Sequence, residues 1–112
     1  MSEEITSMSA MQLVEQYRTK RLSPVEAVKA ALARIEKLQP IYNAFVMVDE
    51  ESALPWARES EARWQKGVPL GLVDGVPSTV KDLILTKGWP TRRGSRTIDP
   101  NQPWEEDGAS VA

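Results

Sequence analysis

The sequence has 112 residues, the length of a single domain with a modest hydrophobic core. Fourteen Lys and Arg residues against sixteen Asp and Glu residues give a net charge of −2, so the chain lacks the basic excess typical of a nucleic-acid-binding protein. Neither Cys nor His is present, which excludes disulfides, a thiolate nucleophile, a Ser-His-Asp triad and any Cys- or His-ligated metal within this chain.

Two amphipathic helices are predicted near the N-terminus. Residues 9–12, Ser-Ala-Met-Gln, have the form of a capping box, and the apolar residues that follow at helical spacing predict a helix over about 10–19. Residues 23–26, Ser-Pro-Val-Glu, are a stronger start signal, because Ser can cap a helix, Pro fits its first turn and Glu completes the box. Pro40 predicts that this second helix, over about 24–38, ends before it.

The following segments predict a connector, a third helix and a strand. Residues 41–48 are an apolar run that could form a strand or an extended connector. Residues 49–65 predict a helix ended by Gly67, and their weak apolar stripe predicts a peripheral position. Residues 78–85, Ser-Thr-Val-Lys-Asp-Leu-Ile-Leu, follow a turn and predict a β-strand. Residues 103–107 have the composition of the entry to another helix.

Lys81 is the residue with the clearest chemical potential. Alternation along the predicted strand places it on one face with Thr79, Leu83 and Leu85, among largely apolar neighbours. Burial of an ammonium group without a partner lowers its pKa, so a neutral amine would be available as a base. The alternative is a strand lysine whose charged end reaches solvent or pairs with a carboxylate, and the spacing alone favours this alternative.

Three other groups of residues are interpreted as structural. Residues 71–77 match no phosphate-binding loop and predict a turn that leads into the strand. Residues 105–107, Glu-Glu-Asp, could bind a hard cation but better suit the acidic first turn of a helix. Residues 91–96 are locally basic, and a solvated surface accounts for them better than an anion site. We therefore expect neither a cofactor nor a metal ion.

The residues around Lys81 resemble those of a known family. Residues 71–95, Gly-Leu-Val-Asp-Gly-Val-Pro-Ser-Thr-Val-Lys-Asp-Leu-Ile-Leu-Thr-Lys-Gly-Trp-Pro-Thr-Arg-Arg-Gly-Ser, are similar to the segment around the catalytic lysine of the amidase signature family. In that family Gly-Val/Ile-Pro precedes a short strand ending in Lys-Asp, and Gly, Thr and Gly-Ser follow. Upstream, residues 22–26, 33–36 and 43–45 look like the family's opening helices. The resemblance covers nearly the whole chain.

The resemblance implies an α/β fold, with a helical segment over 1–66 followed, over 67–112, by the first strands of a mixed sheet flanked by helices. It implies amide hydrolysis by acyl transfer to a serine, with a Ser–cis-Ser–Lys triad in which Lys81 accepts a proton from the bridging serine. The family's two catalytic serines lie downstream of the matching residues, so Ser78 and Ser95 receive no catalytic role. We therefore expect an N-terminal fragment that is inactive alone.

Expectations about partners and location follow. The full-length enzyme would act on a small-molecule amide, without direct contact to nucleic acid or a membrane. The acidic N-terminus lacks the layout of a signal peptide, and a cytoplasmic location fits. Residues 88–95 look more like those of stand-alone bacterial amidases than those of the amidase subunit of a glutamyl-tRNA(Gln) amidotransferase, which remains an alternative.

A second alternative is a small helical interaction or dimerisation module. In it, helices over 10–19 and 24–38 would pair as a hairpin and present their remaining apolar surface to a partner. Lys81 would then be exposed and dispensable. The apolar surface of an incomplete fold is also compatible with a homo-oligomer.

Overall fold

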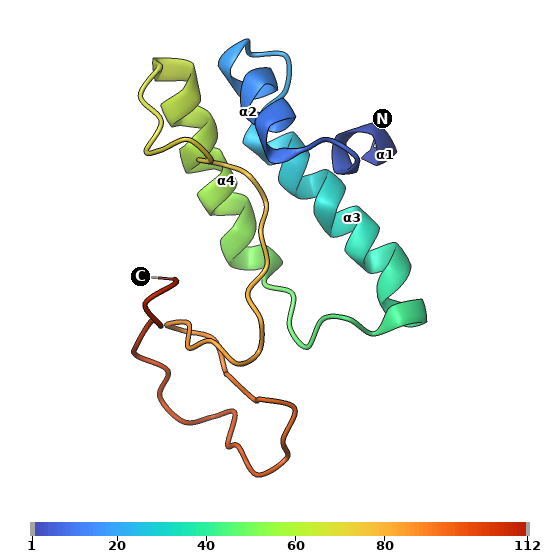
Figure 1. Ribbon diagram of the computed structural model, residues 1–112, viewed down its shortest axis with the longest axis vertical. Coiled ribbons are helices and arrows are strands. Elements are labelled where there is room, and N and C mark those ends of the chain that lie inside the picture. Colours follow the sequence, from blue (N-terminus) through green and yellow to red (C-terminus); the bar gives the residue numbers. More distant parts are fainter. Residues whose placement is uncertain (1, 112) are drawn as a thin grey trace. The chain divides into compact units, whose positions relative to one another are not determined.

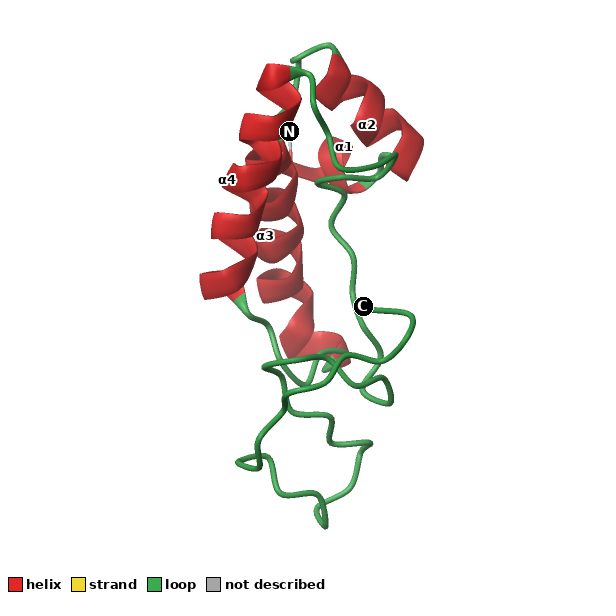
Figure 2. Ribbon diagram, turned by 90° about the vertical axis from the view of Figure 1, so that its left-hand side faces the viewer, coloured by secondary structure: helices red, strands yellow, loops and turns green. Residues whose placement is uncertain are grey.

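The computed structural model describes residues 2–111, and helices are its regular elements (Figures 1 and 2). They are α1 (Ser2–Thr6), α2 (Ala10–Arg18), α3 (Pro24–Tyr42) and α4 (Glu50–Lys66). Within the described residues the chain divides after Pro77 into two compact units. We call residues 2–77 the helical unit and residues 78–111 the loop unit, and describe each by itself.

Capping boxes fix the starts of α2 and α3. The Ser9 hydroxyl accepts the Gln12 N–H at 3.1 Å, and the Gln12 side chain accepts the Ser9 N–H at 2.8 Å. Ser23 and Glu26 exchange the same two bonds, each at 3.2 Å. These bonds satisfy N–H groups that a helix start otherwise leaves without partners. The predicted starts of both helices are confirmed.

The predicted end of α3 before Pro40 is wrong, because the helix continues through this residue to Tyr42. Proline removes one helical hydrogen bond, and so close to the C-terminus little of the helix depends on it. Asn43, in the left-handed conformation with φ 49°, ends the helix and donates its N–H to Gln39 O at 2.7 Å. The Gln39 amide then exchanges two bonds with the Phe45 backbone, at 2.6 and 3.0 Å. A connector follows, not a strand.

Helix α4 starts and ends as predicted, but it is not peripheral. The Asp49 carboxylate accepts the Ser52 N–H at 3.1 Å, and Gly67, with φ 74°, ends the helix. Ala57 and Ser60 are both buried, and α4 packs against α3. The apolar stripe looked weak in the sequence because small side chains, not large ones, make this contact.

The predicted β-strand over 78–85 is not formed. Between residues 2 and 111 the only β-type pairing is an isolated antiparallel bridge from Thr86 to Trp89. The α/β fold class, with helices followed by the first strands of a mixed sheet, is therefore wrong for the described residues. A strand needs a neighbouring strand to satisfy its backbone groups. Without one, the segment turns, and Ile84 donates its N–H to Lys81 O at 3.1 Å.

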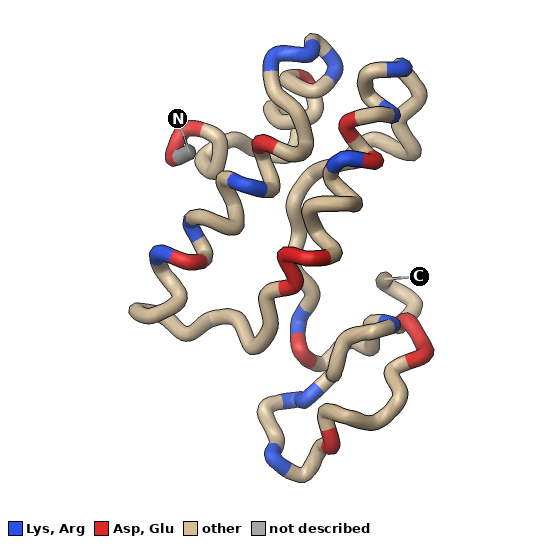
Figure 3. The backbone as a smooth tube through the Cα atoms, turned by 180° about the vertical axis from the view of Figure 1, so that it is seen from behind, with Lys and Arg blue, Asp and Glu red and all other residues tan. Residues whose placement is uncertain are grey.

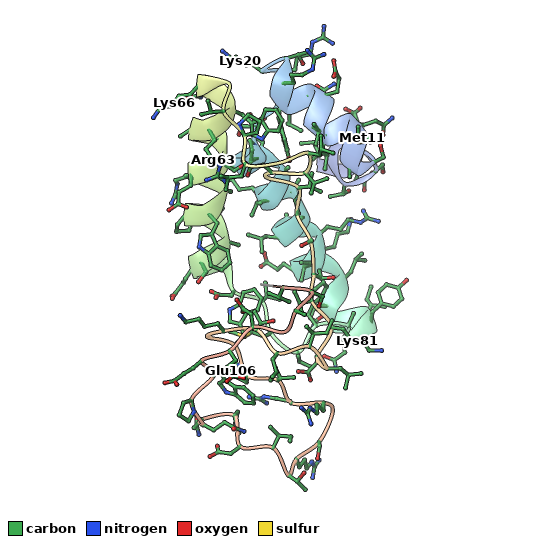
Figure 4. All side chains as sticks on the ribbon, turned by 60° about the vertical axis from the view of Figure 1, so that its left-hand side comes forward. Met11, Lys20, Arg63, Lys66, Lys81 and Glu106 are labelled. Carbon is green, nitrogen blue, oxygen red and sulfur yellow. The ribbon has the colours of Figure 1, made fainter. Side chains whose placement is uncertain are left out.

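The Asp74 side chain attaches the loop after α4 to that helix (Figure 4). Its carboxylate accepts the Ser60 hydroxyl at 2.8 Å and two N–H groups of Arg63 at 2.7 Å each. It also accepts the Leu70 N–H at 2.9 Å. The Arg63 hydrogen bonds, with smaller contributions from Leu70 and Ser60, lower the pKa of Asp74 to about 2. The side chain is only 5 % exposed, so these bonds replace most of its hydration.

The backbone beside Asp74 is anchored as well, so the loop returns along α4 toward α2 (Figure 1). Trp64 Nε1 donates to Asp74 O, and the Tyr17 hydroxyl donates to Gly75 O, each at 2.9 Å. Tyr17 is 1 % exposed, and burial raises its pKa to about 12. The core around it is completed by Leu13 and Ala27, with Ile5, Met8, Leu22, Trp64 and Val76 packed against them.

The outer surface carries interspersed charges of both signs (Figure 3). It also exposes large apolar side chains, among them Ile41, Tyr42, Val46, Leu70 and Leu72. Apolar surface exposed to this extent is usually covered by other protein. No helix among the described residues has the length and apolar character to cross a membrane.

We expect Gly75→Ala to destabilise the helical unit more than Gly67→Ala. Both glycines have positive φ, which costs a residue with a side chain about 1–2 kcal/mol. A Cβ at Gly67 meets nothing within 4 Å, whereas a Cβ at Gly75 lies 2.5 Å from Ser60 Oγ and 2.7 Å from Pro24 Cγ. The overpacking adds about 1–3 kcal/mol. Urea denaturation of both variants measures the difference, and equal losses would contradict the packing around Gly75.

We expect stability to fall as the pH drops from 4 to 2 through protonation of Asp74. Its pKa lies below the ordinary value of 3.8 in the folded chain, so the stabilisation is complete above that value and is lost on acidification toward pH 2. The loss is about 1–2 kcal/mol, less than the shift alone implies because the Arg63 side chain is 27 % exposed.

Denaturation at several pH values measures this loss, with Asp74→Asn as the test and Glu15→Gln as the control. Glu15 pairs with Arg18 on the exposed face of α2, so its removal should leave most of the acid-dependent loss in place. An unchanged pH dependence in Asp74→Asn would contradict the assignment.

Candidate functional site

Lys81 lies near the start of the loop unit, and its side chain is exposed (Figure 4). The expectation that it sits among apolar neighbours on one face of a strand is wrong for the described residues. The alternation argument assumed a strand, and the turn closed by Ile84 N–H and Lys81 O removes its basis. The described residues thus fix the backbone of Lys81 without enclosing its amine.

The residue after Lys81 ties this segment to a distant part of the loop unit. Asp82 Oδ1 accepts the Arg92 N–H at 2.7 Å, and Asp82 O accepts the Arg93 N–H at 3.1 Å. The chain can present both N–H groups because it turns sharply here, with Arg93 and Gly94 both at positive φ. Asp82 therefore closes a loop that begins directly after Lys81.

A second closure joins residues 85–88 to residues 104–108. Three hydrogen bonds of 2.7 Å each form it. They run from Lys87 N to Asp107 Oδ1, from Gly88 N to Trp104 O and from Gly108 N to Leu85 O. Each partner is distant in sequence, so this contact holds the far half of the loop unit against the segment that follows Lys81.

The acidic residues 105–107 serve this closure and do not begin a helix, so the predicted helix entry is wrong. The Asp107 carboxylate accepts the Lys87 N–H, where the sequence pattern had indicated a helix N-terminus. Among residues 2–111, no group of three or more acidic side chains is placed to hold a metal ion. Residues 91–96 contribute backbone N–H groups to Asp82, and Thr91 is buried within them.

Asp74 is a structurally decisive residue that the sequence pattern did not reveal. It lies within residues 71–77, which we interpreted only as a turn. Its partners come from one face of α4, where Ser60, Arg63 and Trp64 follow at helical spacing. An acidic residue in the loop after a helix, with a hydroxyl, a guanidinium and an indole on one face of that helix, is the signal that could have found it.

The largest hollow in the helical unit is an open apolar pocket of about 320 Å³ formed by α1, α3 and residues 44–45. Among the described residues that line it, none is a carboxylate or a lysine. Its charged residue, Arg34, stays protonated at physiological pH and cannot act as a base. The pocket therefore offers apolar contact but no group for proton transfer.

Comparison with known proteins gives consistent relatives, each of them a glutamyl-tRNA(Gln) amidotransferase subunit. The Amidase family matches over residues 26–112. The relative from Myxococcus xanthus is 40% identical over 96 residues, which are 86% of this chain and 20% of the relative. The relative from Salinispora arenicola is 42% identical over 95 residues, 85% of this chain and 19% of the relative. The mitochondrial relative from Ixodes scapularis is 40% identical over 92 residues, 82% and 18%.

The chain spans about a fifth of the length of these relatives. No solved structure matches it. The family match includes Lys81 and the whole of residues 71–95, the segment on which the resemblance was based. Because that match covers most of the sequence, the chain belongs to the amidase family.

Proposed function

We propose that this chain is the part of an amide hydrolase that supplies Lys81 as the proton-accepting base. The observation that carries the proposal is the family match over residues 26–112, which includes the Gly-Val-Pro and Lys-Asp elements of residues 75–82. Lys81 is the residue of this chain that corresponds to the family's catalytic lysine.

In the proposed reaction a serine oxygen attacks the amide carbonyl and forms an ester with the acyl group. The proton of that serine passes to a bridging serine, whose own proton passes to the Lys81 amine. The proton then returns to the departing nitrogen as the carbon–nitrogen bond breaks, and water hydrolyses the ester. Both serines would come from protein outside these 112 residues.

The exposure of Lys81 sets a requirement for this role. An exposed lysine amine is protonated at neutral pH and cannot accept a proton. Other parts of a full-length enzyme would therefore have to enclose Lys81, and the exposed apolar side chains of this chain provide surface for such contact. The proposal accordingly assigns activity to the full-length enzyme and none to the 112-residue chain.

For the substrate, the names of the relatives favour glutamine. They are subunits of glutamyl-tRNA(Gln) amidotransferases, in which ammonia freed from glutamine would be transferred to glutamate on tRNA. This choice reverses the preference for stand-alone amidases that residues 88–95 suggested. Faster ammonia release from glutamine than from simple aliphatic amides would support it.

One observation favours a second candidate function, a helical dimerisation module. Such a module predicts an exposed and dispensable Lys81, and the side chain is exposed here. Light scattering on the 112-residue chain distinguishes the two, because a module should form a defined dimer while Lys81→Ala leaves dimerisation unchanged.

We expect Lys81→Ala to lower kcat about 10²–10⁴-fold in a full-length enzyme carrying this segment, because the base of the triad is lost. A suitable enzyme is the Myxococcus xanthus relative in which this chain replaces the matched 96 residues. Ammonia release measures the rate. Lys87→Ala is the matched control, since Lys87 is another exposed lysine of the loop unit and its backbone N–H makes its bond to Asp107.

Thermal unfolding of both variants shows whether each remains folded. Loss of activity in Lys81→Ala with retention in Lys87→Ala supports the proposal. Turnover by Lys81→Ala at the unmodified rate would overturn it.

A further inference from the structure

We infer that Asp82 is a positioning residue for Lys81: it holds the backbone from which the amine projects and does not itself exchange protons in the reaction. The inference rests on the proposed role of Lys81 and adds a second residue to it. It starts from the two bonds that Asp82 makes to residues 92 and 93.

Those bonds attach Asp82 at two points. Its side chain accepts the Arg92 N–H at 2.7 Å, and its main-chain carbonyl accepts the Arg93 N–H at 3.1 Å. The first bond has an ionised acceptor, which makes it shorter and stronger than a bond between neutral groups. A residue bonded through both its side chain and its main chain has little freedom to rotate about its own φ and ψ.

Lys81 lies directly beside this attachment. Its carbonyl accepts the Ile84 N–H at 3.1 Å, so the carbonyls of Lys81 and Asp82 are both hydrogen-bonded. The direction of the Lys81 Cα–Cβ bond is set by this backbone. A lysine side chain has four rotatable bonds, and a base must meet its proton donor within a fraction of an ångström, so the orientation of the first bond matters greatly.

The use of the Asp82 carboxylate also favours the base. A carboxylate paired with a lysine stabilises the protonated amine and opposes proton acceptance. Asp82 Oδ1 is instead engaged by the Arg92 N–H. The bond that orients the backbone thereby occupies the acidic group nearest to Lys81 in the sequence.

Asp107 provides a matched comparison within the same unit. Its Oδ1 accepts the Lys87 N–H at 2.7 Å, the same length and the same kind of bond as that from Arg92 to Asp82. Asp107 is, however, far from Lys81 in sequence, and its carboxylate acts on the backbone of Lys87. Loss of either carboxylate should weaken the loop unit, but only loss of Asp82 should affect catalysis through Lys81.

The decisive experiment compares Asp82→Asn with Asp82→Glu in the full-length chimeric enzyme described above, with Asp107→Ala as control. Asn keeps an acceptor oxygen in place without the charge, whereas Glu keeps the charge and moves the acceptor by one methylene. We expect Asn to retain kcat within about threefold and Glu to lower it about 10–100-fold with KM unchanged. Asp107→Ala should retain kcat.

Hydrogen exchange at the Arg92 amide supplies a readout independent of activity. It should remain slow in Asp82→Asn and become faster in Asp82→Glu. An impaired Asn variant beside an active Glu variant would overturn the inference, because charge and not geometry would then be required. Fast Arg92 exchange with unchanged kcat would also overturn it. If instead Lys81→Ala keeps full activity, the proposed function fails, whatever the Asp82 variants do.

Discussion

The hydrogen-bonded carboxylate of Asp74 is the contact on which the helical unit depends. It joins the Ser60 and Arg63 side chains of α4 to the backbone of its own loop, while the carbonyls beside it accept from Trp64 and Tyr17. A buried carboxylate stripped of such donors costs several kcal/mol. The loop therefore stays on the helices, and it fixes the end of the helical unit a few residues before Lys81.

The loop unit uses the same chemistry without helices. Asp82 and Asp107 each accept a backbone N–H from a residue distant in sequence, and each such bond to a charged group contributes about 1.5–3 kcal/mol. Few side chains of this unit are buried, so these bonds replace the hydrophobic core that a longer segment would build. The backbone around Lys81 is thus ordered by carboxylates and not by packing.

The features that the sequence predicts correctly are local ones. The caps at Ser9 and Ser23 involve residues three apart, so their residue types suffice to predict them. The strand over 78–85 depends on a partner strand, which residue types within the segment cannot supply. Asp74 escaped prediction for the same reason, since Arg63 lies eleven residues away on a helix whose orientation the sequence does not specify. Lys81 was identified through its surrounding motif, while its exposure depends on tertiary structure.

The central claim is that the amine of residue 81 performs a proton transfer, and chemical rescue tests it most directly. The 112 residues contain no cysteine, so Lys81→Cys in the full-length enzyme, with cysteines elsewhere replaced, creates a unique thiol in this segment. Alkylation with 2-bromoethylamine restores an amine at nearly the length of lysine, whereas iodoacetamide adds a neutral amide. The account predicts that activity returns with the first reagent and not with the second. Equal activity after both treatments would contradict it.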